Sequence, residues 1–424
     1  MTYMVKFLTV TISSLYFLTL VVCSSTSQAQ TDSISLEQAI GMALTKNQTV
    51  SISDVEVRQS ESHLREVQST KLPYIFLRSH YLYAPENGYN EIVTNGGEYG
   101  LQMTTGIPLY DGGIRSATIH QAANAIDRST TQLQKTKTDL TFDVRSAYYE
   151  ILRAESELRI RDETVQRLGD YLSFLAQLQE GGSGNAGDVM KARVEFNTSV
   201  IDQQNSRQAV RKAKMVLNKL IGNAIDSDIE IASTNTTDTS SILQFSIDDN
   251  PSVKVLNHDK LSADDDLTIA KGERLPTLAI AGDVGLLGVH PSEYRNNFGY
   301  SVFLSLDLPL WSWGGINNRI QQKELSREHL DREIDVQKRD LELQWNTTIS
   351  DIQYSRSALA SYSRNIDEAE KNYLLAKSLF AGGSGSNLEV LDAQRLIVEI
   401  KLDYNNALFQ LNSSLATALK LSGK

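Results

Sequence analysis

The stretch from Gly112 to Gly222 has a second copy later in the chain, and this internal duplication limits the fold more than any other feature. Three marks recur in the same order: a Gly-Gly pair, a Gly-Gly-Ser-Gly run and a closing glycine. In the first copy they are Gly112-Gly113, Gly181-Gly182-Ser183-Gly184 and Gly222; in the second they are Gly314-Gly315, Gly382-Gly383-Ser384-Gly385 and Gly423. We therefore expect two structurally similar halves.

Apolar residues recur at every seventh position between the first two marks of each copy. They are Val144, Ile151, Leu158, Val165 and Leu172 in the first copy, and Trp345, Ile352, Leu359, Ile366, Tyr373 and Phe380 in the second. A seven-residue apolar repeat is typical of a helix packed in a coiled-coil seam. The pattern predicts long helices over 114–180 and 316–381, each extending roughly 100 Å at about 1.5 Å per residue. We expect return helices to start at Asp188 and at Ser386, with Glu389 as the capping-box partner of Ser386.

Shorter helices are predicted before each long one. Their spans are Leu36 to Thr45, opened by a Ser35–Gln38 capping box, then Val50 to Lys71, and a counterpart from Asn250-Pro251 to Lys271. A return helix can cover only half of its long partner, so the short helix can cover the other half. The polar stretch from Asn223 to Ser246, with a short strand predicted at Ile229–Ile231, is expected to wrap around the middle of the rod that the long helices form.

After Pro73 and Pro276 the apolar period changes from helical to alternating. The apolar positions are Ile75, Leu77, Tyr81 and Tyr83; Tyr99, Leu101, Met103 and Ile107; Leu278, Ile280, Val284 and Leu286; and Phe298, Tyr300, Val302, Leu304, Leu306 and Leu308. Alternation predicts four strands of about ten residues in two hairpins. The second strand of each hairpin is expected to end at Pro108 or Pro309, because proline removes a ladder donor. The following Gly-Gly pair then allows the chain to turn into the long helix.

Strands of this length match a span across an outer membrane. A sheet half-buried in a soluble domain is the alternative, disfavoured because no further helix is available to cover the apolar face. Four strands cannot stand alone in lipid, because each unpaired edge group costs several kcal/mol. Two copies would give eight strands, and three would give twelve with room for a lumen. The opposite face is small and polar, as a water-filled pore requires, at Gly100, Gln102, Thr104, Ser301, Ser305 and Asp307.

The N-terminus is typical of a secretory signal peptide over 1–29. Lys6 is followed by an apolar region from Phe7 to Val22 and a cleavage site at Ser27-Gln28-Ala29. The only cysteine, Cys23, lies inside this segment, so cleavage would leave no disulfide or thiol chemistry. The net charge of −11, from 41 basic and 52 acidic residues, argues against a nucleic-acid partner.

Catalytic and metal-binding motifs are not found. The six histidines, at positions 63, 80, 120, 258, 290 and 329, lack ligand spacing, and we interpret them as ordinary surface or seam residues. We expect neither an enzyme nor a cofactor. The pair Trp311 and Trp313 is interpreted as an interfacial anchor where the strands meet the helices.

Over nearly the whole chain after the signal peptide, the sequence resembles the TolC-like outer-membrane efflux protein family. The resemblance is carried by the duplication, by the turns 108–113 and 309–315, and by Leu388-Glu389-Val390-Leu391-Asp392-Ala393. It implies a mainly α homotrimer with a twelve-stranded outer-membrane β-barrel continuous with a periplasmic α-barrel. It also implies a periplasmic adaptor and an inner-membrane pump as partners, with small toxic compounds leaving through a passive duct.

With that resemblance, the chain divides into eight segments. They are the signal peptide (1–29), N-terminal periplasmic helices (30–72), first β-hairpin (73–111), first helical hairpin (112–222), equatorial linker (223–249), second short helix (250–275), second β-hairpin (276–313) and second helical hairpin (314–424).

The resemblance also suggests the functional residues. Glu389 and Asp392 fall where the family places an acidic ring that narrows the periplasmic entrance, and such rings attract cations and repel anions. The alternative is that Glu389 only caps its helix and Asp392 is a solvated surface residue. The adaptor-contact tips are expected at 181–184 and 382–385, and the barrel-to-helix turns at Pro108, Gly112, Gly113, Pro309, Gly314 and Gly315. The tips read Gly-Gly-Ser-Gly instead of the family's Val-Gly-Thr-like sequence.

Other functions remain open at this point. A duct for type I protein secretion needs the same shape. A periplasmic coiled-coil adaptor or an envelope scaffold belongs to a different class. The four strands of membrane-crossing length and the second helical hairpin disfavour an adaptor, which would carry compact β domains instead.

Overall fold

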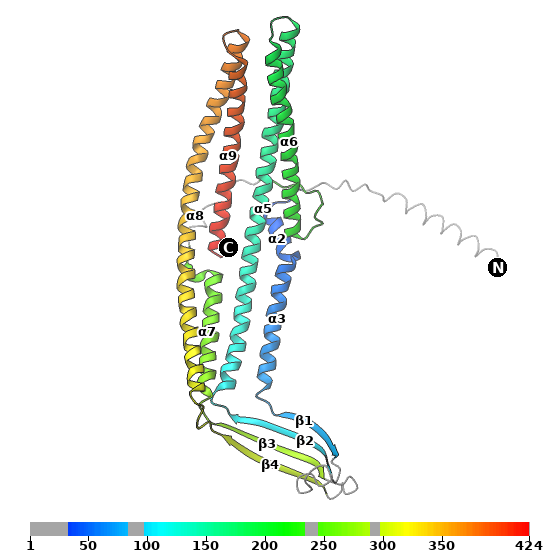
Figure 1. Cartoon of the computed structure of the whole chain (residues 1–424), viewed down its shortest axis with the longest axis vertical. Helices are drawn as coiled ribbons and strands as arrows, with labels where there is room; N and C mark the ends of the chain where they lie inside the picture. The colour runs from blue at the N-terminus through cyan, green and yellow to red at the C-terminus, as the bar shows by residue number, and fades with distance from the viewer. Residues whose placement is uncertain (1–32, 84–96, 234–244, 289–296, 424) are drawn as a thin grey trace, which may run out of the picture.

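The computed structural model describes residues 33–83, 97–233, 245–288 and 297–423. The predicted signal peptide, Cys23, His290 and most of both inter-strand loops lie outside the described residues. Figure 1 shows a long helical rod with a small sheet at one end and two helical hairpin tips at the other.

Both halves follow the same order of elements, as the duplication predicts. The first half contains α2 (Leu36–Lys46), α3 (Gln48–Ser69), β1 (Tyr74–Tyr83), β2 (Gly97–Tyr110), α5 (Ile114–Glu180) and α6 (Ala186–Ile221). The second contains the 3-10 turn η2 (Ile247–Asp249), α7 (Pro251–Gly272), β3 (Thr277–Gly288), β4 (Phe298–Asp307), α8 (Gly315–Ala381) and α9 (Asn387–Leu421).

Two helix boundaries differ from the predicted ones because an asparagine caps the helix earlier. The Asn47 side chain accepts from the Thr49 amide, so α3 begins at Gln48 and not at Val50, and it also ends earlier, at Ser69. The Asn185 side chain accepts from the Gly187 amide, so α6 begins at Ala186 and not at Asp188. Asparagine is among the preferred N-cap residues.

Each long helix is covered along its length by two shorter ones. The 67-residue α5 packs against α3 near the sheet and against α6 toward the tip, while the 67-residue α8 packs against α7 and α9 in the same way. The halves are joined because α5 also packs against α7 and α9. The predicted arrangement, in which the short helix and the return helix each cover half of the long helix, is therefore confirmed.

Two pairs of helices, α3 with α6 and α7 with α9, meet end to end through matching asparagines. Asn47 Nδ2 donates to the Leu220 carbonyl at 2.9 Å, and Asn250 Nδ2 donates to the Leu421 carbonyl at 3.0 Å. Each of these asparagines therefore caps the N-terminus of one helix while satisfying a carbonyl at the C-terminus of the other.

The predicted seam holds in the middle of the rod; toward the tip it shifts in the first copy, whereas in the second copy the predicted Tyr373 is still buried. Val144, Ile151 and Ile352 are buried at the expected positions. Nearer the tip the buried positions are Leu168, Tyr171 and Leu175, and the predicted Leu158, Val165 and Leu172 are only half-buried. An α-helix has about 3.6 residues per turn, so a strict seven-residue stripe drifts around its surface.

The N-terminal segment and the linker meet at the middle of the rod. Tyr148 is fully buried there and donates to the carbonyls of Ile34 and Ala232, at 2.9 and 2.6 Å. Burial raises the pKa of Tyr148 to about 12. The strand predicted at Ile229–Ile231 is reduced to a single parallel bridge between Ile231 and Ile34.

The four strands form one antiparallel sheet in the order β1-β2-β3-β4. On one face Leu77 lies opposite Met103, Met103 opposite Val284, and Val284 opposite Tyr300. On the other face Thr104 and Ser301 both donate to the Asp283 carboxylate, at 2.8 and 3.0 Å. The predicted alternation of apolar and polar residues is therefore present across all four strands.

The prediction that β2 ends at Pro108 is wrong. Pro108 pairs with Ala279 inside the sheet, and β2 continues to Tyr110 after a register shift. An irregularity of this kind tolerates the missing proline donor. In the second copy β4 ends at Asp307, before Pro309.

None of the described helices combines the length and the apolarity that a membrane-crossing helix needs.

Candidate functional site

The two hairpin tips have the same backbone structure, set by their glycines. In the second tip Gly383 adopts a left-handed φ of +74°, its amide donates to the Phe380 carbonyl, and the Ser384 amide donates to the Leu379 carbonyl. In the first tip Gly182 has a φ of +77°, with the corresponding bonds to Gln179 and Leu178. This is the Schellman motif, in which a left-handed glycine closes the end of a helix.

Glu389 and Asp392 are both exposed near the N-terminus of α9, spaced three residues apart on one side of the helix. The Glu389 carboxylate accepts from the Ser386 amide at 2.9 Å, while the Ser386 hydroxyl accepts from the Glu389 amide at 3.2 Å. The predicted capping box is therefore confirmed. Capping engages only one carboxylate oxygen in a bond to Ser386, so it does not exclude a second role for Glu389.

A groove next to the second tip contains both carboxylates. It has a volume of about 610 Å³ and lies between α8 and α9. Its lining combines Leu375, Leu379 and Leu396 with Glu389, Asp392 and Glu399. The candidate aperture residues thus lie on an open surface that combines apolar side chains with three carboxylates and the guanidinium of Arg395.

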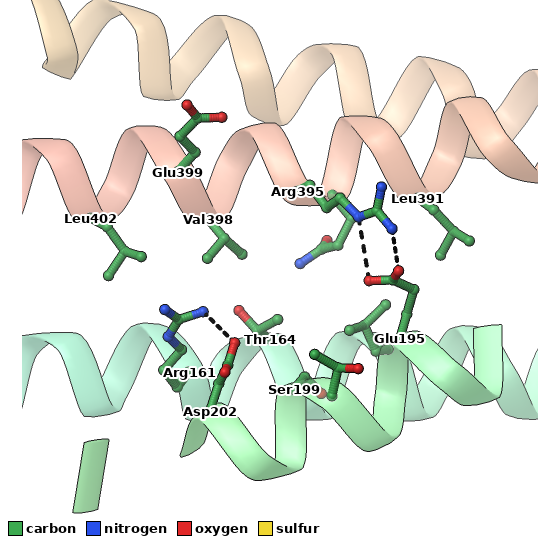
Figure 2. Close-up of a pocket in the computed structure, with 13 residues that line it drawn as sticks. Arg161, Thr164, Glu195, Ser199, Asp202, Leu391, Arg395, Val398, Glu399 and Leu402 are labelled. Carbon is green, nitrogen blue, oxygen red and sulfur yellow. Dashed lines mark hydrogen bonds and ion pairs between the residues drawn. The ribbon is translucent and has the colours of Figure 1, made fainter. Parts of the chain in front are cut away.

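Arg395 connects this acidic surface to the other hairpin. Its guanidinium donates to both carboxylate oxygens of Glu195 on α6 (Figure 2) and to Asp392 Oδ1 at 3.4 Å. The hydrogen bonds to Glu195 raise the pKa of Arg395, so its guanidinium stays charged at any physiological pH. The sequence did not predict this residue, because nothing in it brings positions 195 and 395 together except the duplication itself.

A second contact between the hairpins lies at the base of the tips. Asn387 is buried, accepts from the Tyr171 hydroxyl at 2.8 Å, and donates to Asp188 Oδ1 at 3.2 Å. Burial, with a smaller contribution from the charge of Asp188, raises the pKa of Tyr171. Sequence analysis missed Tyr171 and Asn387 as well. The one available signal is that Asn387 is a polar residue directly before the apolar stripe of α9.

The turns between the strands and the long helices are set by glycine, and the first turn also by a local acidic residue. Gly113 and Gly314 have φ values of +86° and +82° directly before their helices. In the first turn Asp111 accepts from the Gly113 and Arg115 amides at 3.2 Å, and the Arg115 side chain donates to the Pro108 carbonyl at 2.8 Å. These contacts fix the direction in which α5 leaves the sheet.

Among the described residues, no set of three His, Cys, Asp or Glu side chains could hold a metal ion. Two of the histidines instead join α5 to α7: His120 bonds Asp265 at 2.8 Å, and His258 bonds Asn124 at 2.8 Å. The interpretation of these two as seam residues is confirmed.

Comparison with known families gives a match over both halves of the chain. The family described as outer membrane efflux protein matches residues 39–223 and 242–424. The chain belongs to the outer membrane efflux protein family. This is a family of outer-membrane channels and not of enzymes.

Individual relatives are distant in sequence. The chain is 24% identical over 414 residues to the outer membrane protein TolC of Escherichia coli K12, covering 91% of this chain and 80% of the relative. With TolC of Vibrio cholerae it shares 21% over 291 residues, covering 66% of each chain. It is 20% identical to the cobalt-zinc-cadmium resistance protein CzcC of Cupriavidus metallidurans, covering 75% of this chain and 76% of CzcC.

Solved structures share the fold at still lower identity. CusC superimposes with a TM-score of 0.83 at 14% identity, covering 92% of both chains. The outer-membrane channel OprN gives 0.81 at 16% identity, covering 92% of this chain and 90% of OprN.

Proposed function

We propose that three copies of this chain form an outer-membrane channel that serves as the passive exit duct of a tripartite efflux system. The strands of three copies would close a twelve-stranded barrel, and their helices would form a periplasmic tube. Small toxic compounds would leave through the lumen, driven by an inner-membrane pump to which a periplasmic adaptor couples the duct.

The observation that carries this proposal is the sheet. Its apolar face is exposed, with Tyr300, Leu304 and Leu306 between 64% and 83% accessible, and no described helix covers it (Figure 1). Among the described strands, the outer two, β1 and β4, each pair with only one neighbour. In hydrocarbon the exposed apolar face is favourable, whereas unpaired edge groups cost several kcal/mol each, so closure requires further copies.

The polar face supports a water-filled interior. The hydroxyls of Thr104 and Ser301 both donate to the Asp283 carboxylate on this face. In a closed barrel whose apolar face meets lipid, these groups would line the lumen.

The tip residues would control the periplasmic end. Three copies would place the carboxylates of Glu389 and Asp392 around one axis, where they favour cations and a narrow, counterion-bridged opening. Gly181, Gly182, Ser183 and Gly184, with Gly382, Gly383, Ser384 and Gly385, would present the two tips to the adaptor.

Conductance of the purified protein in a planar bilayer tests the proposal, with a matched pair of variants on adjacent residues of β4. Leu304 lies on the apolar face and Ser305 on the polar face. Leu304→Lys should reduce insertion, because a lysine facing lipid at mid-membrane costs roughly 2–4 kcal/mol. Ser305→Lys should leave insertion intact and lower the cation preference of the current. A monomer that passes no current, or equal behaviour of the two variants, would exclude the duct.

A further inference from the structure

A pocket of about 330 Å³ lies between the two helical hairpins, in the half of the rod that carries the tips. Figure 2 shows α9 along one side and α5 with α6 along the other, so one small molecule could contact all three helices. The volume is at the lower end of the range found for small-molecule sites. It is separate from the groove between α8 and α9, although Arg395 and Glu399 border both.

The charges that line the pocket are largely neutralised within the protein. Arg161 donates to Asp202 at 3.0 Å, and Arg395 donates to Glu195 (Figure 2). Glu399 is exposed at the rim. The hydroxyls of Thr164 and Ser199 are taken up by carbonyls of their own helices, at 2.7 Å each. A charged ligand would therefore meet no free counter-charge in the interior of this pocket.

Gln394 is the exception, because its side chain is buried without a partner. The residue is only 3% exposed, and neither its amide nitrogen nor its amide oxygen has a hydrogen bond among the described residues. It interrupts an apolar stripe of α9 formed by Val390, Leu391, Ile397 and Val398. A buried amide without partners is costly, and such groups are uncommon in native structures.

A second unpaired donor lies on the opposite wall. Arg161 Nε is buried and has no hydrogen-bond acceptor in the described part of the chain, although a terminal nitrogen of the same guanidinium donates to Asp202. The pocket thus offers a donor and an acceptor from Gln394 and one donor from Arg161. The rest of its interior wall includes the apolar side chains of Leu168, Leu391, Val398 and Leu402.

We propose that this pocket is a binding site for an uncharged small molecule that carries a carboxamide, lactam or urea group on an apolar body. The amide of Gln394 can form a paired donor and acceptor contact with such a group, and Arg161 Nε can donate to its carbonyl. The apolar body would cover the leucine and valine side chains. This site does not depend on the function proposed above.

Binding would couple the two hairpins. A molecule that contacts α5, α6 and α9 together binds best when the hairpins lie as they do in this structure. Its occupancy therefore shifts the population toward this arrangement.

The test uses 4-fluorobenzamide as the probe and fluorine NMR of the purified full chain in detergent, with empty micelles subtracted. We expect saturable binding of 4-fluorobenzamide and at least about tenfold weaker binding of 4-fluorobenzoate, which has the same shape but a charge and no N–H donor.

Three variants complete the test. Gln394→Leu keeps the buried volume and removes the amide, so it should weaken benzamide binding at least about tenfold. Thr198→Trp, at an exposed position on the rim, should block the pocket without disturbing the core. Gln353→Leu, at an exposed site on α8 that does not line the pocket, should bind as the unmodified chain does. Absence of saturable binding, equal affinity for benzoate, or unchanged binding by Gln394→Leu and Thr198→Trp would each overturn the proposal.

Discussion

The two glycines at the end of α8 should respond in opposite ways to the same substitution. Gly382 has a φ of −80°, and a Cβ built there would come no closer than 3.4 Å to another atom. Gly383 has open space around a built Cβ but a φ of +74°. Alanine is therefore sterically acceptable at both positions and conformationally acceptable only at Gly382.

The expected magnitudes follow from the backbone. Alanine in the left-handed region costs about 1–2 kcal/mol, so Gly383→Ala should weaken the tip by that amount. Gly382→Ala should stabilise it by about 0.4–1 kcal/mol, because alanine restricts the unfolded chain. The difference of about 1.5–3 kcal/mol corresponds to a roughly ten- to hundredfold ratio of local opening.

Hydrogen exchange measured by mass spectrometry on peptides spanning 379–386 reports that opening. The Ser384 amide, which donates to the Leu379 carbonyl at 2.9 Å, should exchange faster in Gly383→Ala than in Gly382→Ala by this ratio. The same comparison can be made at the first tip with Gly182→Ala and Gly181→Ala, since Gly182 has a φ of +77° and corresponds to Gly383. Equal exchange in Gly382→Ala and Gly383→Ala would refute the assignment of the tip glycines to the backbone turn.

Three further predictions concern other contacts. Asn250→Ala should lower the thermal stability measured by circular dichroism by about 1–3 kcal/mol, and more than Asn47→Ala, because Asn250 is buried where it binds the Leu421 carbonyl. The double variant Glu389→Gln, Asp392→Asn should raise conductance and weaken cation selectivity while keeping the helix cap, since glutamine also serves in a capping box. Unchanged currents would show that Glu389 and Asp392 do not act at the aperture and are ordinary surface residues. Burial raises the pKa of Tyr148 above its unfolded value of 10.0 to about 12, so its contribution to stability is complete below pH 10 and is lost as pH rises toward 12. The Tyr148→Phe variant should therefore lose less helicity than the unmodified chain as pH rises from 10 toward 12. Identical pH profiles of the two proteins would contradict this.

Local sequence signals predicted the parts of the fold that depend on neighbouring residues. The Ser386–Glu389 capping box and the Asn250 cap are confirmed because each motif lies within a few residues of chain. The strands were also predictable, since alternation along one strand is enough to define its faces. The prediction that β2 ends at Pro108 failed because the register shift between β2 and β3 lets the strand continue past the proline, and the sequence of one strand does not show such a shift.

Contacts between the halves could not be predicted in the same way. The bond from Arg395 to Glu195 and the bond from Tyr171 to Asn387 join residues that are about two hundred positions apart. A seven-residue repeat shows that a helix has a partner, but it does not show which face of which helix that partner presents. The same limit explains why the buried positions shift to Leu168, Tyr171 and Leu175 near the tip.

Comparison of the two halves separates structural residues from candidates for function. The left-handed glycines of the tips and the asparagine caps at the end-to-end joints occur in both halves with the same contacts, so their explanation is structural. Arg395 has no such counterpart: it extends from the second hairpin to Glu195 of the first and also binds Asp392. A structural role shared by both hairpins would be expected in both copies of a duplicated sequence. We therefore propose that the two hairpins differ in role around Asp392 and Arg395, and the charge-removing variants of Glu389 and Asp392 address this region directly.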